Sequence, residues 1–136
     1  MNKTRSELRE SIMTILYQIS LYDKNKIEYD SKEVIKECSE IESEFINTIV
    51  NGVLEKSDEL ESLANKYLTN WTIDRLGLPD KAILKSAIYE MLYTDTPDVV
   101  CINEAIELGK KYSDDNVVKM INSVLDKIMT EKETNG

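Results

Sequence analysis

Apolar residues recur along this chain every three or four positions, which is the spacing of one buried face of a helix. The first stripe predicts a helix over residues 3–22, and a second long stripe predicts one over residues 40–55. A shorter helix is expected between them over residues 31–38, with Ser31 as its amino-terminal cap. The apolar positions of the three stripes are Leu8, Ile12, Ile15, Leu16 and Ile19; Val34, Ile35 and Cys38; and Ile41, Phe45, Ile46, Ile49, Val50, Val53 and Leu54.

A fourth helix is expected to follow the second long stripe, capped by Ser57 or Asp58. Its buried positions are Leu60, Leu63, Ala64 and Tyr67. Polar residues, glycine and proline then interrupt the pattern over residues 70–79, and this break contains the only tryptophan, Trp71. The boundary between two helical halves is predicted here.

Proline and capping residues mark the helices of the second half. Pro79 presets φ and lacks only an N–H that would be unpaired at a first helical position, so a helix is predicted from there to about residue 93. Thr96 is expected to cap the next helix and Pro97 to begin it. A last helix is expected after residues 113–115. No segment retains the alternating pattern of a strand.

We therefore predict an all-α fold with about seven helices in two helical-bundle subdomains, over about residues 1–70 and 71–131 of one domain spanning residues 1–136. Residues 132–136 are expected to fray. A chain of this size buries roughly two thirds of its unfolded surface, which is enough for a core without disulfides or a metal. Four glycines and two prolines also leave little material for the turns of a sheet protein.

The composition excludes several kinds of chemistry. There is no histidine, and Cys38 and Cys101 stand apart, so the chain cannot assemble a zinc site or a Ser–His or Cys–His nucleophile. Phosphate-binding glycine motifs are also missing from the sequence. We expect a protein that is no enzyme, holds no metal or cofactor and keeps both thiols reduced. Since no run approaches the roughly 20 apolar residues that span a bilayer, we expect a cytoplasmic protein without membrane contact.

Charge is distributed unevenly along the chain. The net charge is −9, yet residues 1–27 hold five basic against three acidic side chains, a balance of +2. Residues 28–62 hold three basic against eleven acidic side chains, a balance of −8. The amino-terminal segment is therefore free to face an anion. The acidic segment could receive a basic protein, and an ordinary solvated face is the alternative.

The stretch CINEAIELGKKYS, residues 101–113, places Glu104 and Glu107 one helical turn apart. The buried stripe through it is Ile102, Ala105, Ile106 and Gly109. Both glutamates are therefore expected on the flank, with Glu107 and Lys111 at the spacing of a stabilising i, i+4 pair. A pair of glutamates could also bind a metal or act as acid and base. Carboxylate metal bundles combine such glutamates with histidines, so a solvated helix is expected instead.

A candidate recognition site lies at the amino end. Arg5 and Arg9 are spaced i, i+4 and share a helix face, and Lys3 lies nearby. Tyr17 follows two turns beyond Arg9 on roughly the same side. Arginine forks suit phosphates and a tyrosine ring suits an unstacked base, so the pattern predicts a single-stranded RNA ligand. The alternative is a solvated face with a half-buried tyrosine, since Glu7 stands among the arginines.

Five blocks, in order, resemble the NusB family of bacterial transcription antitermination factors along nearly the whole chain. They are LRESIMTILYQISLY; FINTIVNGVLE; W-x-x-x-R with DKAILKSAIYEMLY; P-x-x-V-x-INEAIELGKKYS; and MINSVLDKI. The resemblance implies seven helices in two subdomains. It also implies an adaptor that binds the single-stranded boxA element of nascent ribosomal RNA together with NusE, a small-subunit ribosomal protein. The resulting complex would help RNA polymerase to resist termination.

The resemblance also implies roles for particular residues. Arg5 and Arg9 occupy positions of the family's arginine-rich motif, and Tyr17 matches its tyrosine. The region that would complete the RNA surface contains Asn116, Lys119 and Met120. Asp80 matches an acidic position on the surface that faces NusE.

The chain departs from the family pattern at three positions. Met120 stands where phenylalanine is common, and Ser6 and Glu7 replace further arginines. These departures imply a weaker intrinsic affinity for RNA and a greater dependence on NusE. A helical protein–protein scaffold without intrinsic RNA binding is therefore the alternative function, and a monomer and a homodimer both remain open.

Overall fold

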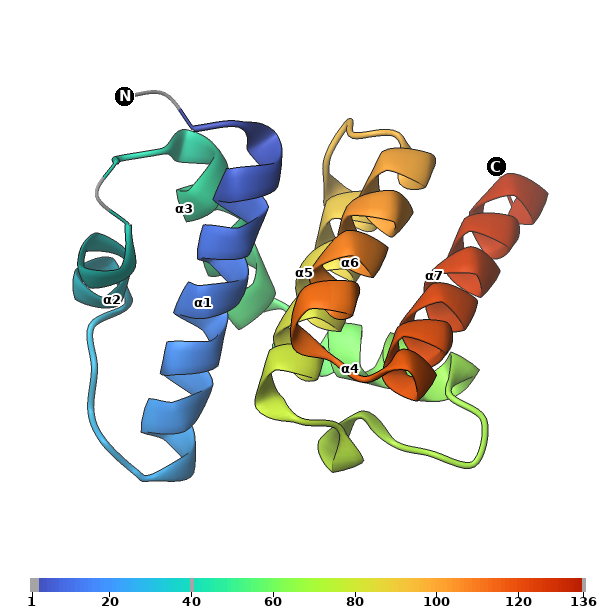
Figure 1. The fold of residues 1–136 in the computed structure, drawn as a ribbon, viewed down its shortest axis with the longest axis horizontal. Helices are drawn as coiled ribbons and strands as arrows, with labels where there is room; N and C mark the ends of the chain where they lie inside the picture. The colour runs from blue at the N-terminus through green and yellow to red at the C-terminus, as the bar shows by residue number, and fades with distance from the viewer. Residues whose placement is uncertain (1–2, 40, 136) are drawn as a thin grey trace.

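The computed structural model describes residues 3–39 and 41–135, which form seven α-helices and one short 3-10 helix (Figure 1). The elements are α1 (Arg5–Lys24), α2 (Ser31–Cys38), α3 (Glu44–Glu55), α4 (Ser57–Tyr67), η1 (Ile73–Arg75), α5 (Leu78–Tyr93), α6 (Asp98–Tyr112) and α7 (Asp115–Asn135). No strand occurs in this part of the chain. The predicted all-α fold is confirmed, and η1 is an addition inside the predicted break.

The helices pack around the central pair α1 and α5. Helices α2 and α3 cover one side of α1, while α6 packs on α5 and α7 packs on α6 (Figure 1). A single buried core runs through both groups. Helix α4 packs mainly against α5 and α7. The apolar face of α4 is therefore covered by the helices that follow the predicted boundary near residue 70.

The amino-terminal caps of three helices differ from their prediction. Asp30, one residue before Ser31, caps α2 by accepting a hydrogen bond from the backbone N–H of Lys32 at 3.0 Å. Helix α4 has no side-chain cap, and its cap position is Lys56. The cap position of α6 is Pro97 and not the predicted Thr96, and no side chain caps this helix. Helix α3 begins later than predicted, after Ser43, and Glu40 lies outside the described residues.

Helix α7 continues to Asn135, through most of the segment that was predicted to fray. Side chains near its end are held by the rest of the molecule. Lys132 Nζ donates to the backbone oxygen of Met91 at 2.6 Å and pairs with Asp98 at 2.8 Å. Gly136 lies outside the described part of the chain.

Within residues 3–39 and 41–135, no helix combines the length and apolar character needed to cross a bilayer.

Candidate nucleic-acid interface

Helices α1 and α6 lie side by side and run in the same direction (Figure 1). Ser6 Oγ, near the start of α1, donates to Glu104 Oε1 at 2.8 Å. Further along, Lys111 Nζ in α6 donates to Glu10 Oε1 at 2.6 Å. We call this surface, defined by Arg5, Ser6 and Glu10 of α1 and by Glu104, Lys111 and Tyr112 of α6, the α1/α6 face. It contains the amino-terminal part of the predicted RNA site.

The charges of residues 101–113 hold this face together, and one predicted pair is wrong. Glu107 pairs with Lys110 at 3.4 Å, one position earlier than the predicted partner, Lys111. Lys111 is directed instead toward Glu10 of α1. Glu104 lies on the flank of α6, as predicted, and its neighbour there is α1. Glu104 and Glu10 therefore join α1 to α6, whereas Glu107 pairs within α6.

Arg9 lies beneath the α1/α6 face, where it binds two carboxylates. Its Nε and NH2 donate to the two oxygens of Glu90 at 2.9 and 2.6 Å, and NH1 lies 3.9 Å from Glu104. Arg9 is 8% exposed and Glu90 is 3% exposed. The hydrogen bond to Glu90 raises the pKa of Arg9 above its usual value. Arg9, which was predicted to contact RNA, is therefore buried, because α5 supplies an acidic partner beneath the face.

Arg5 and Lys3 are placed differently from Arg9. The Arg5 side chain is exposed, and its guanidinium lies 4.2 Å from the centre of the Phe45 ring. The guanidinium of Arg9 lies 5.4 Å from the same ring, which agrees with the predicted shared face. Lys3 Nζ donates to Ser11 Oγ at 3.5 Å. Arg5 is thus the residue of the predicted pair that can reach a ligand.

The other predicted RNA residues lie toward the far end of the face. Twelve positions separate Arg5 from Tyr17, which is about 18 Å along a helix. Tyr17 is half-buried. In the first turns of α7, Asn116 and Lys119 are exposed, whereas Met120 is half-buried against the core. The predicted residues therefore spread along a surface and do not form one compact cluster.

Asp80 connects two parts of the carboxy-terminal group of helices. Its Oδ2 accepts a hydrogen bond from the backbone N–H of Gly77 at 3.1 Å, at the amino end of α5. Its Oδ1 accepts from the hydroxyl of Ser113, between α6 and α7. The carboxylate is half-buried. Asp80 therefore caps α5 and holds the α6–α7 turn, and a partner could reach only its remaining surface.

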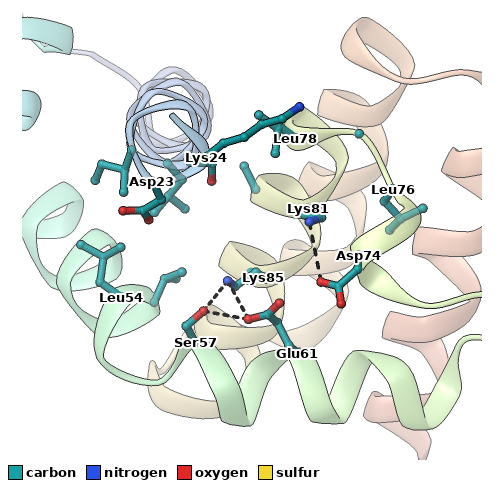
Figure 2. A pocket seen from close by; sticks show the side chains of 16 residues that line it. Asp23, Lys24, Leu54, Ser57, Glu61, Asp74, Leu76, Leu78, Lys81 and Lys85 are labelled. Atoms are coloured by element: carbon teal, nitrogen blue, oxygen red, sulfur yellow. Dashed lines mark hydrogen bonds and ion pairs between the residues drawn. The ribbon is translucent and has the colours of Figure 1, made fainter. Parts of the chain in front are cut away.

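A cleft of about 610 Å³ opens between the end of α1, the α3–α4 junction and the start of α5 (Figure 2). Its apolar wall includes Leu16, Ile19, Val53, Leu54, Leu76 and Leu78. Lys85 donates to Ser57 Oγ at 2.5 Å and lies 3.6 Å from Glu61. Lys81 lies 3.8 Å from Asp74. A cleft with apolar walls and paired charges suits a protein segment better than a phosphate.

Sequence reasoning missed Glu90, Glu10 and the cleft. The position of Glu90 could have been noticed in the sequence. It follows Ile83 by seven positions and Ala87 by three, so it falls within an apolar stripe. A charge at such a position indicates a buried partner. The cleft had no comparable signal, since its walls come from separate elements.

The two cysteines differ in burial, and this difference is testable. Cys101 is 2% exposed, and burial raises the pKa of its thiol to about 12. At pH 8 only about one Cys101 in ten thousand is therefore the reactive thiolate. We expect iodoacetamide to modify Cys38, which is half-buried, and to spare Cys101 in the native protein. Mass spectrometry should find both modified in denaturant, and native modification of Cys101 at an equal rate would contradict its burial.

Comparison with known proteins decides the family. A sequence model described as the NusB family matches residues 6–130. The chain belongs to the NusB family. The transcription antitermination protein NusB of Bacillus subtilis (strain 168) is 39% identical over 132 residues, covering 95% of this chain and 97% of that protein. Its counterpart in Campylobacter jejuni (strain RM1221) is 35% identical over 130 residues, covering 96% and 98%. The resemblance stated from the motifs is confirmed.

Solved structures show the same NusB-family fold. NusB of T. maritima superposes with a TM-score of 0.84 at 28% identity, covering 96% of this chain and 94% of that one. A chain in the crystal structure of the antitermination factors NusB and NusE in complex with double-stranded RNA gives a TM-score of 0.77 at 24% identity, covering 93% and 96%.

Proposed function

We propose that this protein is a transcription antitermination factor that binds single-stranded boxA RNA of nascent ribosomal transcripts together with NusE. The match to the NusB family over residues 6–130 carries this proposal. The bound pair would join the antitermination complex of RNA polymerase, and it would act in the cytoplasm. The solved NusB–NusE complex contains double-stranded RNA, so the preference for a single strand is part of what must be tested.

The RNA would follow the α1/α6 face toward the start of α7. Arg5 would contact phosphate, because its guanidinium is exposed and braced by Phe45. The remaining proposed contacts are Lys3, Tyr17, Asn116, Lys119 and Met120. Arg9 would act indirectly by fixing α1 against α5, since its fork already binds Glu90.

NusE would dock beside Asp80, at the cleft between α1, the α3–α4 junction and α5 (Figure 2). The cleft offers apolar surface to bury and charged groups at which to pair, a combination typical of protein interfaces. Its walls include Gly77 and Lys81, which flank Asp80 in the sequence. This site lies apart from Arg5, so one molecule could bind both partners.

A second candidate is a helical scaffold that binds proteins without intrinsic RNA affinity. The internal pairing of basic groups on the α1/α6 face favours it, because Lys111 binds Glu10 and Lys110 binds Glu107. The net charge of −9 also favours the scaffold, because it repels nucleic acid at long range.

Fluorescence anisotropy of a labelled boxA RNA separates the two functions. We expect tighter binding to boxA than to a scrambled RNA, a further gain when NusE is added, and weakening as salt rises. Arg5→Ala should lower the affinity about three- to tenfold and make the salt dependence shallower by about 0.7 in logarithmic slope, which is the effect of one lost phosphate contact on a single strand.

Arg75→Ala is the matched control for this experiment. Arg75 is also exposed and lies over an aromatic ring, 4.3 Å from the centre of Trp71, but it belongs to η1. Its substitution should leave boxA affinity unchanged. Equal binding of boxA and scrambled RNA, or no binding with or without NusE, would reject the RNA-binding function and leave the scaffold.

A further inference from the structure

We propose that Lys111 is an RNA phosphate contact and that Glu10 withholds it in the free protein. This inference rests on the proposed function, because it names a regulated contact within the same RNA surface. It concerns three residues that meet between α1 and α6, namely Glu10, Lys111 and Tyr112. We call them the Glu10 cluster.

The geometry of the Glu10 cluster converges on one oxygen. Lys111 Nζ and the hydroxyl of Tyr112 both donate to Glu10 Oε1, the first at 2.6 Å. These hydrogen bonds lower the pKa of Glu10, with Lys111 as the largest cause. The carboxylate is therefore charged at neutral pH, and it holds the cation and the phenol on the surface of α6.

The cluster also lies where an RNA strand would have to pass. Arg5 stands near the start of α1, and Asn116 follows the cluster by four positions, in the first turn of α7. Since α1 and α6 are parallel neighbours, a strand running from Arg5 to Asn116 crosses the surface that contains Lys111. The proposed RNA residues alone leave this middle part without a cation.

Exposure makes the pair easy to exchange. The side chains of Lys111 and Glu10 are 60% and 31% exposed, and ion pairs in such positions contribute little to stability. A phosphate can therefore replace Glu10 as the partner of Lys111 without any unfolding of the protein. The displaced carboxylate would remain beside the phosphate and repel it, so Glu10 should lower the affinity even after exchange.

Glu10→Gln tests this directly, because glutamine keeps the size of the side chain and removes its charge. With NusE present and at about 50 mM salt, we expect the variant to bind labelled boxA RNA about three- to tenfold more tightly than the wild type. The dependence of affinity on salt should become steeper by about 0.7 in logarithmic slope, since one more lysine displaces a counterion. Adding Lys111→Ala to this variant should remove most of the gain.

Glu33→Gln provides the matched control. Glu33 and Lys36 form an exposed ion pair at 3.9 Å on α2, away from α6, so this change also frees one lysine and alters the net charge equally. It should leave RNA affinity unchanged, and thermal unfolding should show all variants folded. An equal gain in RNA affinity from Glu33→Gln would show that the change in net charge alone causes the effect, and it would overturn the inference.

Two other results would also reject it. Wild-type affinity in Glu10→Gln, or a gain that survives Lys111→Ala, would show that Lys111 is not withheld from RNA, while the proposed function would stand. Binding of boxA by none of the proteins would instead reject both. A tighter complex with NusE in the absence of RNA would make the Glu10 cluster a protein contact.

Discussion

Arg9→Ala is expected to lower the free energy of unfolding by about 3–5 kcal/mol, because it leaves the carboxylate of Glu90 buried without its partner. Glu90 is 3% exposed and receives two hydrogen bonds from the Arg9 fork. Arg9→Lys should recover only part of the loss, since an ammonium group cannot reproduce that fork. Urea denaturation followed by circular dichroism would measure each value.

Two comparisons separate this structural role from RNA contact. Arg5→Ala should cost less than about 1 kcal/mol, because its main partner in the structure is the face of Phe45 at an exposed site. Arg9→Met combined with Glu90→Met should be more stable than Arg9→Ala, since it removes both buried charges together. If Arg9→Ala unfolds at the wild-type urea concentration yet loses boxA binding, Arg9 is a surface contact and the buried pair is wrong.

The sequence predicted the helices well because their stripes are long and consistent. The stripe from Leu8 to Ile19 is buried along its whole length in α1, and the short helix over residues 31–38 has the predicted ends. Caps were less predictable, because neighbouring residues such as Asp30 and Ser31 can each accept the same kind of hydrogen bond. The packing of α4 could not be read from its own stripe, because the helices that cover its apolar face, α5 and α7, follow later in the chain.

The site was less predictable than the fold, for a reason that Arg9 illustrates. Helical spacing correctly placed Arg5 and Arg9 near one ring, that of Phe45. It could not show that Glu90, which is 81 positions away from Arg9 in the sequence, pairs with Arg9 and leaves Arg5 exposed. The same holds for Lys111, whose local partner Glu107 was predicted and whose actual partner Glu10 is 101 positions away. Long-range ion pairs therefore decide which basic groups are left unpaired for a ligand.

Gly52→Ala is the second substitution with a large expected effect, and even its sign is informative. Alanine normally favours a helix interior over glycine by about 1 kcal/mol. At Gly52, however, a Cβ atom would overlap the ring of Tyr89, where α3 approaches α5. Tyr89 is 9% exposed and packs on Tyr93 with ring centres 5.0 Å apart, so it has little room to move. We expect a net loss of about 1–3 kcal/mol in the free energy of unfolding.

The neighbouring position provides the control for this close approach. Asn51 is exposed in the same helix, so Asn51→Ala should stabilise the protein by a few tenths of a kcal/mol, following helix propensity alone. Gly109→Ala should cost less than Gly52→Ala, because its Cβ would lie 3.0 Å from a methyl group of Val118 and not inside a ring. Thermal unfolding of the three variants would rank them. If Gly52→Ala were as stable as Asn51→Ala, α3 and α5 would be farther apart than the structure places them. The close contact between the two groups of helices at Gly52 would then be wrong.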